Sequence, residues 1–392
     1  MVEKCIRYMA DLEHSETAHD TSHAKRMLYL MNVNWNWIKQ RPQYLAEALS
    51  EFYRIDVYDK VAYRRSRLVK NSVDSISLHH LFRIPFGRYF MIHKVNDIMD
   101  RLRLKSIIKN YDYIWIADIN YFRAIKPYIT KKQCIIYDCM DDIVEFPAYA
   151  HNTKLRTRYI KDETALLNNC SIIFTSANHL KEVLRKRHHD IDANKIYVVN
   201  NAVSDLLLTR HAENSPILRQ DKTQNTKKVI TYIGTISEWI DWNLILKSLE
   251  IFTNIEYHFY GPIVGTVIPN HARICYKGVL KQDKIAGTMH ASDLLIMPFQ
   301  VNPLIESVNP VKLYEYILSG VPSLACGYGE SEKFLDYVYL YYNEKDYMQF
   351  ISRLLKGKLP NKSENGKSFV RNNTWSHRAK EIHDILNTAQ KL

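Results

Sequence analysis

The chain has 392 residues, which is more than one ordinary domain contains, so we expect two domains that are each large enough for a hydrophobic core. Hydrophobic residues make up 46% and charged residues 24%, a composition that excludes an intrinsically disordered chain. No apolar run reaches the roughly 18 residues that a membrane span needs. The six cysteines form no C-x-x-C pair, which argues against a structural zinc site and against a disulfide framework.

The net charge of +12 indicates a protein whose partners are acidic or anionic. Residues 1–26 are expected to form an N-terminal extension. The acidic residues Glu3, Asp11, Glu13 and Glu16 interrupt any signal-peptide pattern in it. We therefore expect the chain to stay in the cytoplasm.

Residues 27–203 alternate between short β-rich runs and helical stretches, a pattern typical of a parallel sheet with crossover helices. The sequence predicts strands at 27–33, 54–58, 113–117, 133–138, 171–175 and 195–199. It predicts helices near 40–51, 121–129, 155–167 and 177–187. These elements indicate one doubly wound, Rossmann-like domain.

The segment 35–43 follows the first expected strand and reads WNWIKQRPQ. Ligands of open parallel sheets bind beyond the carboxyl ends of the strands, which is where this segment lies. Trp37 offers an apolar face to a ligand, while Arg41 and Gln43 can donate hydrogen bonds to hydroxyls or to a phosphate. Packing against the sheet is the alternative for Trp35.

Basic residues gather in the segment 60–109. Against three aspartates, the stretch from residue 60 to residue 105 holds Lys60, Arg64, Arg65, Arg67, Lys70, Arg83, Arg88, Lys94, Arg101, Arg103 and Lys105. From Tyr89 onward, helical spacing places many apolar residues on one side, which is typical of a basic amphipathic helix. We expect this face to dock on an anionic inner-membrane surface. A solvated helix that packs its apolar side on its own domain is the alternative.

Three carboxylates follow the expected strand at 133–138. Asp138, Asp141 and Asp142 lie where that strand ends and a loop begins. A partly desolvated carboxylate in such a place has a raised pKa and can act as a general base. Capping of the following turn or helix is the alternative.

The segment 204–227 is polar, contains Pro216 and lacks periodicity, so we place a linker there. A second alternation then fills residues 228–374 and predicts another Rossmann-like domain. Its expected strands are 229–233, 256–260, 273–276, 293–297, 322–325 and 337–341. A terminal helix is expected within residues 375–392.

Glycine-containing turns close several strands of this second half. Gly234 and Thr235 follow the first strand, and a glycine there lets backbone amides approach an anion closely. Tyr260 and Gly261 end a later strand, and Val279 lies in the turn after the next. Ordinary punctuation between strands and loops is the alternative for any single turn. No G-x-G-x-x-G motif opens a helix after a strand, which argues against a dinucleotide site.

The segment from Asn309 to residue 323 reads as a helix that ends at Gly320 and is followed by a buried strand. Lys312 and Glu315 lie three residues apart and so share one helical face. The ammonium can neutralise a phosphate, and the carboxylate can accept hydrogen bonds from two ribose hydroxyls. A helix N-terminus adds its positive end toward the phosphates. The pair therefore suits a nucleoside diphosphate, with a plain surface pair as the alternative.

This segment resembles the donor-binding segment of nucleotide-sugar glycosyltransferases of the GT-B fold. The matching residues are Pro310, Lys312, Glu315, Tyr316, Gly320 and Pro322. The resemblance implies two Rossmann-like domains that face each other across a cleft, with a nucleotide sugar held by Gly234, Thr235, Tyr260, Gly261, Val279, Asn309, Lys312 and Glu315. Many retaining members of glycosyltransferase family 4 type carry a further glutamate eight positions before the second. This chain has Ser307 there, next to Glu306.

The first half resembles a membrane-associated glucuronosyltransferase of xanthan assembly. Counting from Tyr137, the position of its aspartate base corresponds to Asp141, with Asp142 and Asp138 as the next candidates. A subset of polysaccharide glycosyltransferases also has the W-x-x-x-R-P-Q form, which implies acceptor binding by Trp37, Arg41 and Gln43. In this fold the terminal helix often returns to pack on the first domain.

Together these features predict a metal-independent, inverting glycosyltransferase that needs no cofactor. Its expected donor is a UDP-sugar, and its expected acceptor is a lipid-linked or oligosaccharide chain in bacterial capsule or exopolysaccharide assembly. We expect it to lie peripherally on the inner face of the cell membrane and to bind no nucleic acid. A retaining transferase, a nucleotide-sugar epimerase on the same scaffold and a nucleic-acid-binding protein are the alternatives.

Overall fold

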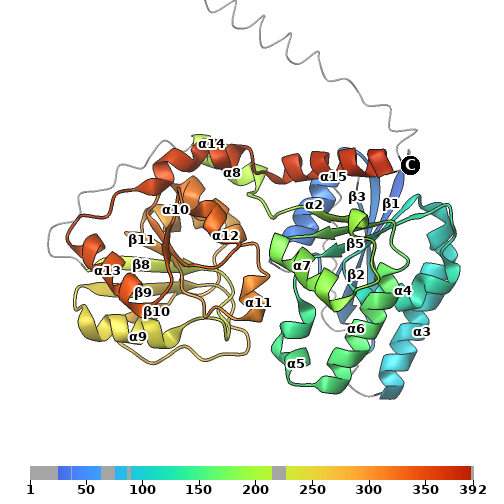
Figure 1. Ribbon diagram of the computed structural model, residues 1–392, viewed down its shortest axis with the longest axis horizontal. Coiled ribbons are helices and arrows are strands. Elements are labelled where there is room, and N and C mark those ends of the chain that lie inside the picture. The colour runs from blue at the N-terminus through green and yellow to red at the C-terminus, as the bar shows by residue number, and fades with distance from the viewer. Residues whose placement is uncertain (1–24, 37, 63–75, 86–89, 214–226, 390–392) are drawn as a thin grey trace, which may run out of the picture.

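The computed structural model describes residues 25–36, 38–62, 76–85, 90–213 and 227–389. Two parallel sheets lie side by side, each with helices on its faces (Figure 1). The first has the strand order β3-β2-β1-β4-β5-β6-β7, and the second has the order β10-β9-β8-β11-β12-β13. Every named strand pair is parallel. The predicted GT-B architecture of two Rossmann-like halves is confirmed.

The first sheet is covered on both faces, so its central strands are almost wholly apolar. Its strands are β1 (Arg26–Leu30), β2 (Arg54–Ala62), β3 (Ile76–Arg83), β4 (Tyr113–Ile116), β5 (Cys134–Cys139), β6 (Ile172–Thr175) and β7 (Ile196–Val198). The helices of this half are α2 (Arg41–Leu49), α3 (Phe90–Ile107), α4 (Ile119–Ile125), α5 (Pro147–Ala150), α6 (Thr153–Leu167) and α7 (Asn178–Arg187). All four residues of β4 are buried. Two apolar clusters, one on each face, form its core.

Strand β3 was not predicted. It lies at the edge of the first sheet and pairs only with β2 among the described strands. Its sequence includes His79, His80 and Arg83, and most of its residues are only half-buried. An edge strand has one partner and much solvent contact, so it needs no continuous apolar run. Because this segment is basic and has no continuous apolar run, its strand could not be predicted from the sequence.

The second sheet and its helices build a separate apolar cluster. Its strands are β8 (Lys228–Ile233), β9 (Ile255–Tyr260), β10 (Ile274–Tyr276), β11 (Leu294–Met297), β12 (Ser323–Cys326) and β13 (Tyr339–Tyr341). The helices of this half are α9 (Trp242–Ile251), α10 (Gln282–His290), α11 (Pro303–Glu306), α12 (Val311–Ser319), α13 (Glu344–Leu355) and α14 (Lys367–Arg371). In β9 the buried side chains alternate with half-exposed ones, because one face of this strand is less covered than the other.

Two further helices connect the halves. Helix α8 (Asp205–Glu213) begins inside the segment 204–227 that the sequence analysis treated as an irregular linker. Helix α15 (Trp375–Ala389) leaves the second half and runs along the first (Figure 1). Trp375 stacks on Tyr44 of α2, with ring centroids 5.5 Å apart. The buried face of α15 joins an apolar cluster of the first half.

Across the described ranges, no helix combines the length and the apolar character that crossing a bilayer requires. The cysteines in these ranges, Cys134, Cys139, Cys170, Cys275 and Cys326, are free thiols.

Candidate functional site

Helix α12 places Lys312 and Glu315 on one face, as their spacing predicts. It ends at Gly320, whose φ of 66° is the left-handed conformation that a glycine adopts readily. The ammonium nitrogen of Lys312 lies 5.7 Å from the ring centroid of Tyr232 and 5.8 Å from that of Phe299. The lysine is therefore held over the carboxyl end of β8.

Gly234 lies directly beneath Lys312. A Cβ atom added to this glycine would lie 2.0 Å from Cε of Lys312. The predicted phosphate turn and the predicted phosphate-binding cation are thus brought together, although 78 residues separate them in the sequence. The absence of a side chain at Gly234 is what allows the lysine to lie there.

Lys312 and Glu315 are in an environment that disfavours both charges. Burial lowers the pKa of Lys312, and the nearby Glu315 opposes this shift. Burial raises the pKa of Glu315 to about 7, and Lys312 opposes this shift. Among the described residues, neither side chain has a hydrogen bond or an ion pair. Shifted ionisable groups without protein partners mark a site that can accept a ligand.

The glycine turns of the second half touch one another. The amide of Gly234 donates to the carbonyl of Tyr260 (2.8 Å), and the amide of Gly261 donates to the carbonyl of Gly278 (2.9 Å). Gly261 has a φ of 139°, and a Cβ atom there would lie 1.9 Å from the carbonyl oxygen of Gly234. Close backbone contact at the ends of β8, β9 and β10 therefore requires glycine.

Gly261→Ala tests this contact. The positive φ costs on the order of 1–3 kcal/mol for a residue with a side chain, and the neighbouring backbone cannot move aside as a side chain can. We expect a melting temperature several degrees lower and weakened nucleotide binding. Gly287→Ala in α10 is the matched control, because open space surrounds that glycine and alanine favours a helix by about 1 kcal/mol. Equal melting temperatures for the two variants would contradict the prediction.

Thr235 and Val279 are two further residues at these turns that are predicted to bind the nucleotide sugar. The carbonyl of Thr235 accepts a hydrogen bond from the Tyr232 hydroxyl (2.7 Å), so this residue closes the turn after β8. Val279 exposes 59% of its surface in the turn after β10. Binding roles for both residues stay predictions.

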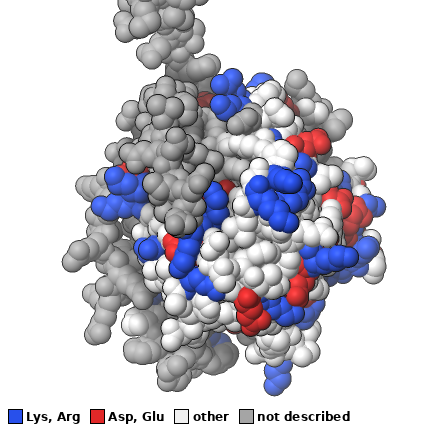
Figure 2. Space-filling model, turned by 90° about the vertical axis from the view of Figure 1, so that its left-hand side faces the viewer, with Lys and Arg blue, Asp and Glu red and all other residues white. Residues whose placement is uncertain are grey.

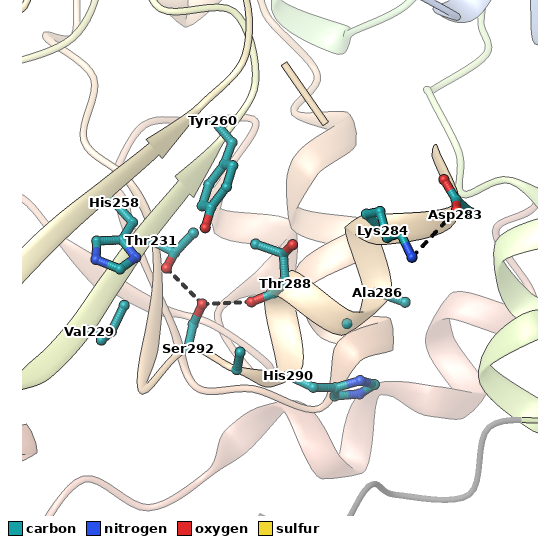
Figure 3. Close-up of a pocket in the computed structure, with 12 residues that line it drawn as sticks. Val229, Thr231, His258, Tyr260, Asp283, Lys284, Ala286, Thr288, His290 and Ser292 are labelled. Carbon is teal, nitrogen blue, oxygen red and sulfur yellow. Dashed lines mark hydrogen bonds and ion pairs between the residues drawn. The ribbon is translucent and has the colours of Figure 1, made fainter. Parts of the chain in front are cut away.

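A cavity of about 570 Å³ lies between α10 and the strands β8 and β9. Figure 3 shows Thr231, Ser292 and Thr288 connected by hydrogen bonds along it, with Tyr260 and His258 on the strand side. Of the predicted donor residues, Tyr260 is the one that lines this cavity. The cavity and the Lys312–Glu315 face are therefore separate features, joined through the turn after Tyr260.

Asn309, another predicted donor residue, lies between the two halves. Its side-chain oxygen accepts from the amide of Asn201 (3.0 Å), and its carbonyl accepts from the Asn201 side chain (2.8 Å). Its side-chain nitrogen Nδ2 donates to Oε2 of Glu330 (3.4 Å). Only 2% of Asn309 is exposed. The structure thus places Asn309 as a bridge at the start of α12, and a donor contact by its side chain stays a prediction.

Arg41 and Asp138 form a buried ion pair. Nη2 and Nε of Arg41 donate to Oδ1 of Asp138 at 2.8 Å and 3.1 Å, and the two residues are 2% and 1% exposed. Nη1 of Arg41 donates to the carbonyl of Val199 and to the side chain of Asn201. Nε, Nη1 and Nη2 of Arg41 therefore all donate hydrogen bonds within the protein. Acceptor binding by Arg41 stays a prediction.

Gln43 and Trp37 are the two other residues predicted to bind the acceptor. Gln43 is buried, and its side chain accepts from the amide of Gln40 (3.1 Å) and donates to the carbonyl of Asn34 (3.3 Å). It therefore fixes the start of α2. Trp37 lies outside the described residues. Acceptor binding by both residues stays a prediction.

The three carboxylates of the acidic loop, residues 138–142, have different partners. Asp138 is held by Arg41, and Asp142 accepts two hydrogen bonds of 2.7 Å from Nη2 of Arg187. The carboxylate of Asp141 has no such partner among the described residues. Burial raises the pKa of Asp141 to about 7; Arg41 opposes the shift, while Asp138 and Asp142 add to it. Asp141 is thus the loop carboxylate best suited to take a proton near neutral pH.

Helix α2 connects the acidic loop to the donor face. Arg41, in its first turn, binds Asp138, and Tyr44 lies three residues further along. The pKa of Tyr44 is raised by burial and by the negative charge of Glu315, so Glu315 of the second half acts electrostatically on α2 of the first. The predicted base loop therefore contacts α2 directly, and the predicted nucleotide face acts on the same helix through the charge of Glu315.

Several residues of the site had no signal in the sequence. Arg187, Glu163, Asn201 and Glu330 are ordinary polar residues of helices and loops, and their partners lie far away in the chain. Within the described part of the chain, no group of three or more His, Cys, Asp or Glu residues could hold a metal ion. A metal-independent reaction stays a prediction.

Comparison with known proteins places these features in a known architecture. No family model matches the chain. Its sequence is 25% identical over 307 residues to TuaH of Bacillus subtilis (strain 168), provisionally named a teichuronic acid biosynthesis glycosyltransferase, and the match covers 73% of this chain and 74% of TuaH.

Two solved structures are similar over nearly the whole chain. Sucrose-phosphate synthase from Thermosynechococcus elongatus has a TM-score of 0.70 at 11% identity, with 93% of this chain and 99% of that one covered. HepE of Anabaena in complex with UDP has a TM-score of 0.65 at 13% identity, with 93% and 100% covered. At these identities the likeness shows the fold, which is GT-B.

Proposed function

We propose that this chain, a glycosyltransferase of the GT-B fold, moves a sugar from a nucleoside diphosphate, preferably UDP, to a lipid-linked or oligosaccharide acceptor in surface polysaccharide biosynthesis. One observation carries the proposal: Lys312 and Glu315 share a face of α12 over Gly234, and among the described residues neither side chain has a hydrogen bond or an ion pair. The name of TuaH refers to teichuronic acid biosynthesis, and HepE was solved with UDP; both support the proposal.

The geometry suits an inverting displacement. An acceptor hydroxyl attacks the anomeric carbon while the bond from that carbon to the diphosphate breaks, and the hydroxyl proton passes to Asp141. Lys312, the amides near Gly234 and the N-terminus of α12 stabilise the negative charge that develops on the diphosphate. Each of these groups lies at the carboxyl end of a strand or at the start of a helix.

Position 307 favours inversion over retention. Many retaining members of the family that the chain resembles carry a glutamate at this place, whereas Ser307 is fully buried and its hydroxyl donates to the carbonyl of Pro303. The neighbouring Glu306 is 48% exposed on its side chain and lies 3.9 Å from the imidazole of His179. No carboxylate therefore occupies position 307.

A thermal-shift screen tests the donor. A ligand that binds only the folded protein raises stability by RT ln(1 + [L]/Kd), which is about 2.7 kcal/mol at a concentration of 100 Kd. We expect UDP and UDP-sugars to raise the melting temperature, and GDP, TDP and CMP compounds to raise it less. Consumption of the stabilising UDP-sugar should then require an added saccharide acceptor. Interconversion of the sugar without an acceptor would instead identify an epimerase.

We further propose that α3 docks this enzyme on an anionic membrane surface. Its residues Met91, Ile98 and Leu102 are 69%, 56% and 63% exposed. With Val95 and Met99, which are also exposed, they form a stripe at helical spacing. This stripe is not covered by the first half, although Leu104 of the same helix is buried in an apolar cluster of that half, as the alternative expects.

The surroundings of this stripe favour a lipid surface. Arg101, Arg103 and Lys105 are exposed on the same helix, which lies on the outer side of the first half (Figure 1). Each basic residue near an anionic surface contributes about 1 kcal/mol. On the opposite end of the molecule, Figure 2 shows basic and acidic side chains interspersed. Much of the remaining basic segment, including residues 63–75, lies outside the described residues.

Flotation with phosphatidylglycerol vesicles tests docking. The triple variant Met91→Gln, Ile98→Gln, Leu102→Gln should lose most vesicle binding, because it removes the apolar contact while keeping the charge. Val267→Gln is the control, since Val267 is 83% exposed in the second half. Binding by the unmodified protein should also fall with salt. Equal binding by the triple variant, or indifference to lipid charge, would contradict docking by α3.

A further inference from the structure

The acidic loop is fixed from one side by the end of β6. The hydroxyl of Ser176 donates to the carbonyl of Met140 (2.7 Å), and the amide of Ser176 donates to the carbonyl of Cys139 (3.2 Å). These bonds hold the backbone immediately before Asp141. After Asp141 the loop continues into a short turn that Arg156 holds, through the carbonyl of Val144 (3.2 Å) and the carboxylate of Glu145 (2.6 Å). Asp142, the residue next to Asp141, has a second attachment of its own.

Arg187, the last residue of α7, supplies that second attachment. Its Nη2 lies 2.7 Å from each carboxylate oxygen of Asp142. Its side chain is 13% exposed and that of Asp142 is 4% exposed, so water screens the pair little. The contact spans 45 residues of sequence and joins the loop after β5 to the end of α7, the helix that follows β6.

A buried network holds Arg187 in turn. Its Nη1 lies 3.4 Å from Oε2 of Glu163, and the same carboxylate oxygen lies 2.8 Å from Nε2 of His188. The other oxygen of Glu163 accepts from the Tyr137 hydroxyl (3.0 Å). Glu163 and the side chain of His188 are each 2% exposed. Tyr137 belongs to β5, the strand that leads into the acidic loop, so the network returns to the base of that loop.

We propose that Arg187 is a positioning residue for sugar transfer: it holds and neutralises Asp142, so that Asp141 alone presents an unpaired carboxylate from the acidic loop. This inference rests on the proposed function, in which Asp141 takes the proton of the acceptor. Nothing in the sequence points to Arg187, which reads as one of several basic residues at the end of a helix.

The charged groups around Asp141 and Asp142 determine the proton affinity of the acidic loop. Asp141 is surrounded by Arg41 of α2, by Asp138 of β5 and by Asp142. Asp142 in turn interacts with Arg187, Glu163 and Glu145. Neighbouring carboxylates raise one another's proton affinity and titrate as a coupled group. The Arg187 guanidinium counters this effect, so its removal should shift proton uptake by the acidic loop to higher pH.

Two substitutions should therefore move the acid limb of the pH–rate profile in opposite directions. Arg187→Gln should lower kcat at least about tenfold and move the limb up by about one pH unit, the lower end of the shift that one charged neighbour produces. Asp142→Asn removes a negative charge and should move the limb down. Arg187→Lys keeps the charge, so its limb should stay near that of the unmodified enzyme while kcat still falls. Arg185→Gln is the control, because Arg185 pairs with Glu182 on the exposed side of the same helix.

A second readout needs no activity. The carboxyl carbon-13 resonance of Asp141, assigned by its loss in Asp141→Asn, can be titrated in the protein without substrate. An opposite movement of this titration in Arg187→Gln and Asp142→Asn supports positioning, even if transfer does not depend on Asp141 and the proposed function fails. An unmoved titration together with an unmoved acid limb in both variants would overturn the proposal. If Arg187→Gln does not fold, the direction found for Asp142→Asn decides.

Discussion

Asp141→Asn should lower kcat by about 10²–10⁴-fold, the usual contribution of a general base, while UDP binding stays normal. The substitution keeps the size of the side chain but removes its ability to take the acceptor proton. UDP affinity by calorimetry and turnover with a UDP-sugar and acceptor are the two measurements. Asp336→Asn, at an exposed position of the second half, is the control. Near-normal turnover by Asp141→Asn would contradict the assignment.

The same carboxylate predicts the pH dependence. Burial raises the pKa of Asp141 to about 7, and the ionised form is the one that accepts a proton. We therefore expect kcat/KM to rise with pH up to about 7 and then to level off. The limb should be missing from the residual activity of Asp141→Asn.

The contribution of Asp141 to folding stability should fall as the pH rises, whereas kcat/KM should increase. The pKa of Asp141 rises from 3.8 to about 7 on folding, so the folded state binds the proton more tightly than the unfolded state. Its contribution to stability is full at low pH and is lost as pH rises through the folded-state value. Asparagine has no such dependence. The melting temperature of Asp141→Asn, relative to the unmodified protein, should increase from pH 4 to pH 7 and change little above it.

Features contained within a short segment could be predicted from the sequence. Lys312 and Glu315 are one helical turn apart, so a helix alone determines that they share a face. The glycines that end β8 and β9 are visible as glycines after apolar runs. The alternation of strands and helices fixes two parallel sheets, because parallel strands need crossover connections. For these reasons the fold and the shared helical face of Lys312 and Glu315 could be predicted from the sequence, and nucleotide binding by that face stays a prediction.

Contacts between distant segments could not be predicted. Arg41 lies 97 residues from Asp138 in the sequence, and the sequence pattern predicts that its guanidinium binds an acceptor. In the structure that guanidinium forms a buried ion pair. A buried guanidinium without a partner would carry a large, uncompensated desolvation cost. Asn309 likewise turned out to face Asn201 across the two halves. Residue type alone could not identify the partner of each side chain, because that partner depended on how distant segments pack.

Lys312→Met and Glu315→Gln should separate the two ends of the donor. Lys312 faces the predicted diphosphate position over Gly234, so methionine should weaken UDP binding and leave uridine binding unchanged. A hydrogen bond to a charged group contributes about 1.5–3 kcal/mol, which corresponds to a loss of about 10- to 150-fold. Glu315 is expected to hold the ribose, so glutamine should weaken uridine and UDP alike. Calorimetric titration of both variants with both ligands at pH 8 measures the difference.

The pH dependence of uridine binding adds an independent check on Glu315. Burial raises the pKa of Glu315 to about 7, and only the ionised carboxylate accepts hydrogen bonds from both ribose hydroxyls. Uridine affinity of the unmodified protein should therefore rise with pH through about 7, whereas that of Glu315→Gln should stay constant. Lys345→Met, at an exposed position of α13, controls for the loss of a positive charge. If Lys312→Met and Lys345→Met bind UDP equally well, α12 does not hold the diphosphate, and the donor site must be sought elsewhere on the second half.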